Sequence, residues 1–278
     1  MLATFKTAGI TIPNYMEQPP PQLDDQPETA PTSSLFSRLF GVLATPSDVF
    51  EEIRRTKVLT VNWVMPMLLL IVLGWIGAVL VFSQENIRHQ LDEMTDKGIQ
   101  KQIEKQHMPE EQAEKAREMG RKFGSLGTKI TMVVAPIMMG VLAVFWWGFL
   151  MWLGAKLWLK TDLSYAKAME GAGLANMVNV LEAIIKPLLI ISLGNLFAGT
   201  NLALFVKEYD PQNPVHGILA AVDVMTFWIL IVRAICLARF TNTSFVKAAA
   251  WVFGVWILMT GTLTGFGLAM QAIFNRGS

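Results

Sequence analysis

Residues 63–82 decide the class of this protein: they read Trp63-Val-Met-Pro-Met-Leu-Leu-Leu-Ile-Val-Leu-Gly-Trp-Ile-Gly-Ala-Val-Leu-Val-Phe82, without one charged side chain. A helix needs about 20 apolar residues to cross the ~30 Å hydrocarbon core of a bilayer. Four more apolar blocks follow, at 130–153, 172–197, 217–238 and 248–273. Backbone polar groups in lipid must be satisfied within the segment, so each block is expected to be a helix. The sequence therefore predicts an all-α integral membrane protein with five transmembrane helices in a bundle.

Composition supports this class and narrows the function. Apolar residues make up 53% of the chain and charged residues 16%, against about 25% charged in soluble domains. A net charge of +1 argues against nucleic acid as a partner. The three histidines, His89, His107 and His216, are too scattered for a metal site. Phosphate-binding glycine loops and nucleophile elbows are absent from the sequence. We therefore expect no enzymatic activity and no cofactor or metal.

The polar segments divide the chain. Residues 1–34 hold six of the 13 prolines and are predicted to be a disordered cytoplasmic tail, with a docking motif as the alternative. Residues 35–57 show two short amphipathic stripes separated by Pro46, which predict interfacial helices at the membrane. The alternative is that they pack on the protein itself. The first transmembrane helix is placed at 63–83, and helices two to five at 129–273.

The polar stretch 84–128 separates the first two apolar blocks. It pairs Glu93 with Lys97 and Glu111 with Lys115 at helical spacing, and Pro109 precedes two glutamates, a pattern typical of a helix start. We predict a helical hairpin outside the membrane. Two interpretations stay open: a solvated hairpin, or a module that binds a protein partner through residues 84–127.

Lysines and arginines are divided unevenly between the two sides of the predicted bundle. The short segments on the N-terminal side carry Arg38, Arg54, Arg55, Lys57, Lys156, Lys160, Lys167, Arg239 and Lys247, and those on the opposite side carry Lys207 and Arg276. Positively charged loops stay in the cytoplasm. The N-terminus is therefore expected in the cytoplasm and the C-terminus outside.

Two loops on the N-terminal side share the pattern T-x-x-S-aromatic-x-K-A, at 161–168 and 241–248. The matching residues are Ser164, Tyr165 and Lys167 in the first copy and Ser244, Phe245 and Lys247 in the second. The serines are natural helix N-caps, and the lysines are expected to meet lipid headgroups. The pattern predicts a parallel internal repeat, with helices two and three related to helices four and five. Coincidence is the alternative.

Three places in the sequence carry a family resemblance. They are residues 36–53 with Pro46 and Phe50, the segment Ser164-Tyr165-Ala166-Lys167-Ala168, and Asp223 with Phe227 and Trp228 at the start of the fourth block. Over residues 35–270 the chain resembles the Yip (Ypt/Rab-interacting protein) domain family in its bacterial form. The resemblance implies five membrane helices, a cytoplasmic N-terminus and a bacterial cytoplasmic (inner) membrane. Eukaryotic members bind small GTPases in vesicle traffic, but no feature here binds one, and Met225 stands where the family often has Phe.

Ionisable and amide side chains within the apolar blocks are functional candidates because they are costly in lipid. These are Asn176, Asn179, Glu182, Lys186, Asp223 and Arg233. Depth along the predicted helices places Lys186 level with Asp223, and Glu182 level with Arg233. Two cross-helix ion pairs are expected, which would fix the bundle. The alternative is a polar path for an ion, a proton or a lipid headgroup.

The last block contains Gly261 and Gly265, a GxxxG motif that lets helices approach closely. Packing within the chain is favoured over a face for a homo-oligomer. Taken together, the sequence predicts a non-enzymatic membrane scaffold or adaptor that wedges its bundle and amphipathic segment into the lipid bilayer and presents 84–127 to a partner. A small transporter or channel using the intramembrane charges is the alternative.

Overall fold

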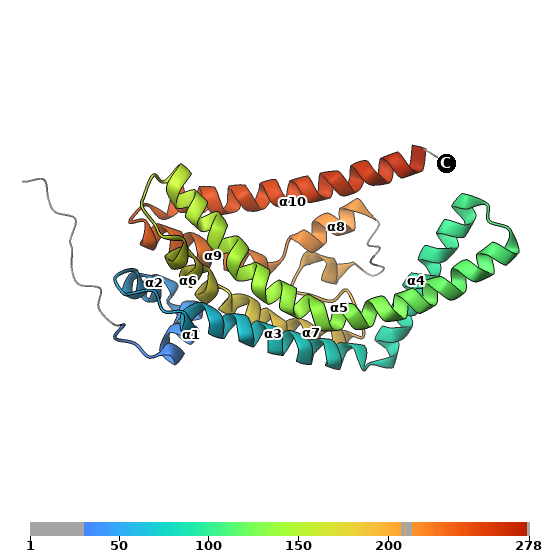
Figure 1. The fold of residues 1–278 in the computed structure, drawn as a ribbon, viewed down its shortest axis with the longest axis horizontal. Helices are drawn as coiled ribbons and strands as arrows, with labels where there is room; N and C mark the ends of the chain where they lie inside the picture. The colour runs from blue at the N-terminus through green and yellow to red at the C-terminus, as the bar shows by residue number, and fades with distance from the viewer. Residues whose placement is uncertain (1–30, 207–208, 210–212, 277–278) are drawn as a thin grey trace, which may run out of the picture.

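The computed structural model describes residues 31–206, 209 and 213–276, so the predicted tail lies almost wholly outside the described residues. Within them the regular elements are all helical (Figure 1). They are α1 (Leu35–Ala44), α2 (Pro46–Arg54), α3 (Val61–Phe82), α4 (Glu85–Gln106), α5 (Glu110–Leu153), the π-helical turn η1 (Gly154–Trp158), α6 (Tyr165–Ala175), α7 (Met177–Leu193), the 3-10 turn η2 (Leu202–Phe205), α8 (Pro214–Ala221), α9 (Val224–Phe240) and α10 (Phe245–Arg276).

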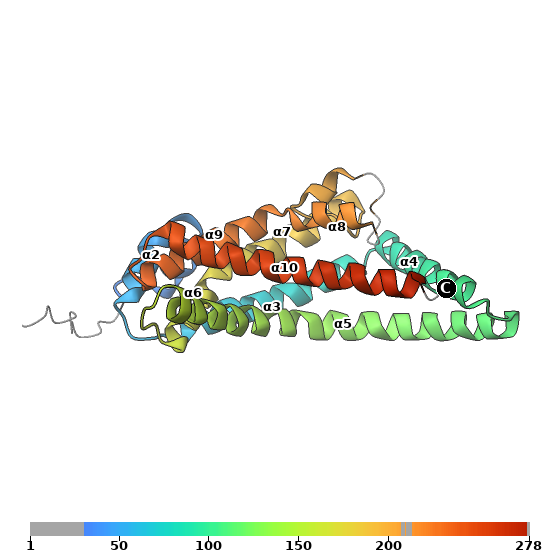
Figure 2. The ribbon, with the colours of Figure 1, turned by 90° about the horizontal axis from the view of Figure 1, so that it is seen from above.

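The molecule is elongated, and its long helices run roughly along the long axis (Figures 1 and 2). Helices α1, α2 and α6 gather at one end, with the end of α9 and the start of α10. At the other end, α4 and the first half of α5 extend beyond the bundle. The main apolar core lies at the α1–α2 end and includes Phe50, Ile53, Leu174 and Leu237.

Four helical stretches are long and apolar enough to cross a membrane, among the described residues: Val61–Phe82, Glu110–Trp158, Tyr165–Leu193 and Phe245–Phe266. The prediction of an all-helical membrane protein is confirmed. The prediction of one continuous helix over 217–238 is wrong, because the chain breaks there into α8 and α9. Asp223 is extended and forms an antiparallel bridge with Asn201. The 17 residues of α9 span only about 25 Å.

Two other helix boundaries differ from the predicted ones. The third block forms two helices, α6 and α7, which meet at Asn176. Helix α7 ends at Leu193, and the backbone of the following residue, Gly194, is in the left-handed conformation. The polar segment forms α4 and the first part of α5, but the second of these helices does not end with the polar segment, because it continues into the next apolar block in the 44 residues of α5. That helix begins just after Pro109, as the sequence predicts.

Close packing of α3 against its neighbours depends on glycine and proline. A Cβ on Gly74 would lie 2.9 Å from Cβ of Pro136 in α5, and one on Gly77 would lie 2.7 Å from Cγ of Pro187 in α7. Both prolines stand inside their helices. The missing side chains therefore give room for the two proline rings, which lets three helices approach closely.

Helix α10 leaves the bundle after its first turns (Figure 1). In the part of the chain that the structure describes, nothing beyond the backbone of α10 itself lies within 4 Å of a Cβ built at Gly261 or Gly265, and Leu258 and Leu263 are exposed. The prediction that this GxxxG motif packs within the chain is wrong. The reason is that α10 touches the bundle chiefly through α9 and η1, which lie near its N-terminal end.

Candidate functional site

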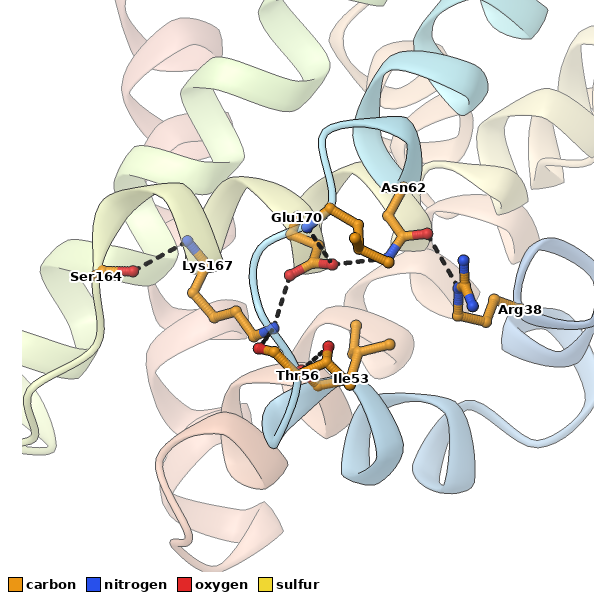
Figure 3. A network of polar contacts seen from close by, with 8 residues as sticks. Arg38, Ile53, Thr56, Asn62, Ser164, Lys167 and Glu170 are labelled. Carbon is orange, nitrogen blue, oxygen red and sulfur yellow. Dashed lines mark hydrogen bonds and ion pairs between the residues drawn. The ribbon is translucent and has the colours of Figure 1, made fainter. Parts of the chain in front are cut away.

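Helix α6 carries a lysine and a glutamate that the fold buries together. Ser164 caps the helix by accepting a hydrogen bond from the backbone N–H of Lys167 at 3.2 Å. Lys167 and Glu170, three residues apart, share one helical face and form an ion pair of 2.8 Å between Nζ and Oε2 (Figure 3). Glu170 is fully buried, so the stability of the fold depends on the partners that compensate its charge.

The other carboxylate oxygen of Glu170 holds the start of α3. It accepts hydrogen bonds from the backbone N–H of Leu59 at 3.1 Å and from Nδ2 of Asn62 at 2.6 Å. Asn62 is also fully buried, and its Oδ1 accepts from Nε of Arg38 at 3.1 Å. Arg38 belongs to α1 and donates a further hydrogen bond to the carbonyl of Ser33. A continuous polar chain therefore runs from α6 through α3 to α1 (Figure 3).

Lys167 joins this network to the connection between α2 and α3. Its Nζ donates to the carbonyl oxygen of Thr56 at 2.9 Å, just after α2, and lies 5.8 Å from the ring centroid of Phe240. The prediction that Lys167 meets lipid headgroups is wrong, because the side chain is buried under the α2–α3 connection. We call Arg38, Thr56, Asn62, Lys167 and Glu170 the latch network. It joins α1 and the α2–α3 connection to the bundle.

The segment before α1 is fixed by Glu52 of α2. Its Oε1 accepts from the hydroxyl of Thr32 at 3.0 Å and the backbone N–H of Ser33 at 2.8 Å. Partial burial raises the pKa of Glu52, but the hydrogen bonds from Ser33 and Thr32 outweigh it and hold this pKa below its ordinary value. The contact therefore contributes stability above the ordinary pKa and loses it as the pH falls through the lowered one.

A second buried cluster surrounds Arg233 of α9. One guanidinium nitrogen donates to Oδ1 of Asn176 at 2.9 Å, and the group stacks 4.0 Å from the ring centroid of Trp147. Asn179 donates to the same Asn176 oxygen at 3.4 Å. The predicted ion pair between Glu182 and Arg233 is not formed in the described residues. The break between α6 and α7 instead places the Asn176 amide beside Arg233.

Asp223, Glu182 and Lys186 serve other roles. Asp223 caps α9: its Oδ1 accepts from the backbone N–H of Met225 at 2.7 Å and from the hydroxyl of Thr200 at 2.8 Å. The predicted pair of Lys186 with Asp223 is likewise not formed in the described part of the chain. Glu182 is half-buried and has both Lys186 and Asp223 among its charged neighbours, while Lys186 is exposed.

Asp223→Ala is expected to lower stability by about 1–2 kcal/mol, because α9 loses its N-cap. Asp223→Asn keeps an acceptor oxygen and should stay close to wild type. Thermal unfolding of the purified protein in detergent measures both. If Asn proved as damaging as Ala, the negative charge would matter and an ion-pair role would be favoured over the cap.

The two copies of the loop pattern differ in their contacts. Tyr165 donates its hydroxyl hydrogen to the carbonyl of Phe145 at 3.1 Å. Ser244 precedes α10 and accepts through its backbone carbonyl from the N–H groups of Lys247 and Ala248, while Phe245 and Lys247 are exposed. Position 250, which corresponds to Glu170, is Ala, so the buried ion pair has no counterpart. The internal repeat remains a prediction.

Sequence reasoning missed most of the latch network. Arg38, Asn62 and Glu170 were not among the predicted site residues, and Lys167 was given another role. The spacing of Lys167 and Glu170 inside an otherwise apolar helix was the available signal.

The chain was compared with known proteins. A family model described as the Yip1 domain matches residues 40–266, which include nearly all of the latch network and the Arg233 cluster. No curated protein and no solved structure matches the chain.

Proposed function

Because the chain belongs to the Yip1 domain family, a family of membrane proteins, we propose that it is a non-enzymatic membrane scaffold whose α1 acts as a wedge at the bilayer interface. We assign the N-terminus and α1 to the cytoplasmic side, which the distribution of positive charge supports, and take the membrane to be a bacterial inner membrane. The segment 84–127 is assigned to binding a protein partner. Each of these assignments is open to direct experiment.

The observation that carries the proposal is the two-faced character of α1. Leu39 and Val42 are buried against the bundle, while Phe36 and Phe40 are 71% and 57% exposed. The two exposed rings stack on each other with centroids 5.5 Å apart. A pair of exposed aromatic rings on a short helix that starts beside the first membrane span suits insertion at the headgroup boundary.

The latch network supports the same function mechanically. A wedge deforms a bilayer only if the force on it is transmitted to a rigid body. Arg38 lies on the inner side of α1 and is tied through Asn62 to Glu170, which is fully buried. Removing one partner of a buried ion pair strands a charge and is costly, so we expect this network to hold α1 in one arrangement. Helix α1 is thus fixed to the transmembrane bundle.

Replacing both rings, Phe36→Ser with Phe40→Ser, is expected to abolish bilayer insertion of α1 while leaving the fold intact. Each buried Phe contributes about 1.5–3 kcal/mol, so the pair dominates the attraction of this helix to lipid. The measurement is quenching of a fluorophore on α1 by brominated lipids in vesicles, together with vesicle diameter by cryo-electron microscopy.

The matched control is Met119→Ser with Phe123→Ser in α5, where the side chains are similarly exposed at 57% and 62%. The control should keep insertion and vesicle shape. Unchanged quenching and unchanged vesicles in the α1 variant would refute the wedge. Solute transport through Glu182, Lys186, Asp223 and Arg233 receives less support, because Asp223 caps α9 and Arg233 is held by Asn176 and Trp147.

A further inference from the structure

A cavity of about 500 Å³ opens beside α2 where α9 turns into α10. Its polar lining comes from Ser47, Arg239, Asn242 and Thr243, and its apolar lining includes Ile235 and Phe245. We propose that this cavity binds the headgroup phosphate of an anionic glycerophospholipid, with an acyl chain along Ile235 and Phe245. The inference is independent of the wedge function of α1.

The charge around the cavity favours an anion. Glu51 is shared by three arginines: Arg54 at 2.8 Å, Arg55 at 3.0 Å and Arg239 at 4.0 Å. One carboxylate cannot neutralise three guanidinium groups, and Arg239 is the most loosely held. Because its side chain is about half exposed at the cavity, Arg239 has donors available for a phosphate. The acidic residue that follows Ser47 in α2, Asp48, is exposed to solvent.

The backbone conformation at the end of α9 fixes the positions of Asn242 and Thr243, two of the other polar residues that line the cavity. Asn242 adopts the left-handed conformation with φ 51, and the N–H groups of Asn242 and Thr243 bond back to the carbonyls of Arg239 and Ala238. This is the Schellman ending of a helix, which satisfies the last carbonyls of α9 and weakens their repulsion of an anion. Ser47 and Phe245 stand in the first turns of α2 and α10, whose N-termini carry partial positive charge.

The place of the cavity in the fold selects a lipid over a free phosphate. Phe245 is the first residue of a helical stretch long and apolar enough to span the membrane. Trp158, which is exposed, donates its indole N–H to the carbonyl of Lys247 at 3.1 Å, in the first turn of the same helix. Exposed tryptophan and lysine mark the headgroup level. A phosphate bound by Arg239 would therefore lie level with lipid headgroups, with apolar wall continuing toward the acyl chains.

The test is native mass spectrometry of the full chain in detergent, titrated with dioleoyl-phosphatidylglycerol, dioleoyl-phosphatidylcholine or inorganic phosphate. The first lipid should bind with one dominant stoichiometry and about fivefold more tightly than the second, the ratio that one basic residue gives at an anionic surface. Arg239→Gln should weaken it by about tenfold or more, since a hydrogen bond to a charged group is lost. Asn242→Gly keeps the backbone conformation and should also weaken binding.

The matched control is Arg55→Gln, which removes the same charge beside Glu51 but does not line the cavity; it should bind as wild type. Circular dichroism without added lipid verifies that each variant is folded. Equal affinity of Arg239→Gln and wild type, equal loss in Arg55→Gln, or equal binding of both lipids would overturn the proposal. Saturation by inorganic phosphate at the same concentration as the anionic lipid would overturn the choice of a lipid.

Discussion

Glu170→Ala should destabilise the folded protein by about 3–5 kcal/mol, the usual cost of removing one partner of a buried ion pair. The substitution leaves Lys167 charged and buried, and it removes the acceptor for both Leu59 N–H and Asn62 Nδ2. Because Asn62 orients Arg38, the loss also reaches α1. The measurement is the midpoint of unfolding in detergent, with protease cleavage in the 55–60 connection as a local probe.

A pair of variants separates charge from hydrogen bonding. Glu170→Gln alone keeps an acceptor for Leu59 and Asn62 but strands the charge of Lys167, so it should remain strongly destabilised. Lys167→Met combined with Glu170→Gln removes the charge as well and should recover most of the stability. If the double variant were no better than Glu170→Gln, the cost would not come from an uncompensated charge and the ionic account of the latch network would fail.

Gly173→Ala should destabilise the protein by about 3 kcal/mol or more, at or above the upper end of ordinary overpacking. A Cβ at this position would lie 2.2 Å from Cβ and 2.4 Å from Cα of Trp63 in α3. The second contact is with backbone, so no side-chain rotation relieves it, and α6 would have to move away from α3. That movement would lengthen the contact between Glu170 and Asn62.

Gly98→Ala in α4 is the matched control, since no described residue outside the local helix backbone lies within 4 Å of a Cβ there and the residue is helical. It should be neutral or stabilise by up to about 1 kcal/mol, the difference in helix propensity. Unfolding midpoints of the two variants are compared under identical conditions. Equal midpoints would show that the contact of α6 with α3 is not as close as the geometry states.

Several features followed from the sequence alone because they depend on local chemistry. The long apolar runs predicted a helical membrane protein, and Ser164 before a helix with free N–H groups predicted a cap that the structure contains. Pro109 likewise preceded a helix start. The family resemblance, drawn from short motifs, agreed with the match over residues 40–266.

The sequence did not predict which charged side chains pair with each other, since this pairing depends on how the helices face each other. Depth along ideal helices put Glu182 beside Arg233, but the break at Asn176 and the cap at Asp223 changed which groups met. From the sequence alone, the carboxylate of Asp223 could equally cap a helix or form an ion pair. Only the positions of Thr200 and of the first α9 N–H groups decided between them.

The sequence by itself determined that the protein is a membrane protein, that it is helical and where several helices begin or end. Each of these features depends on residues that are neighbours along the chain. Tertiary structure alone decided that Lys167 is buried, that Glu170 reaches Asn62 across 108 positions, and that Gly261 and Gly265 contact no other described element of the chain. The physical reason is that burial and ion pairing are properties of contacts between distant segments. Residue spacing fixes which face a side chain occupies, and packing fixes what that face meets.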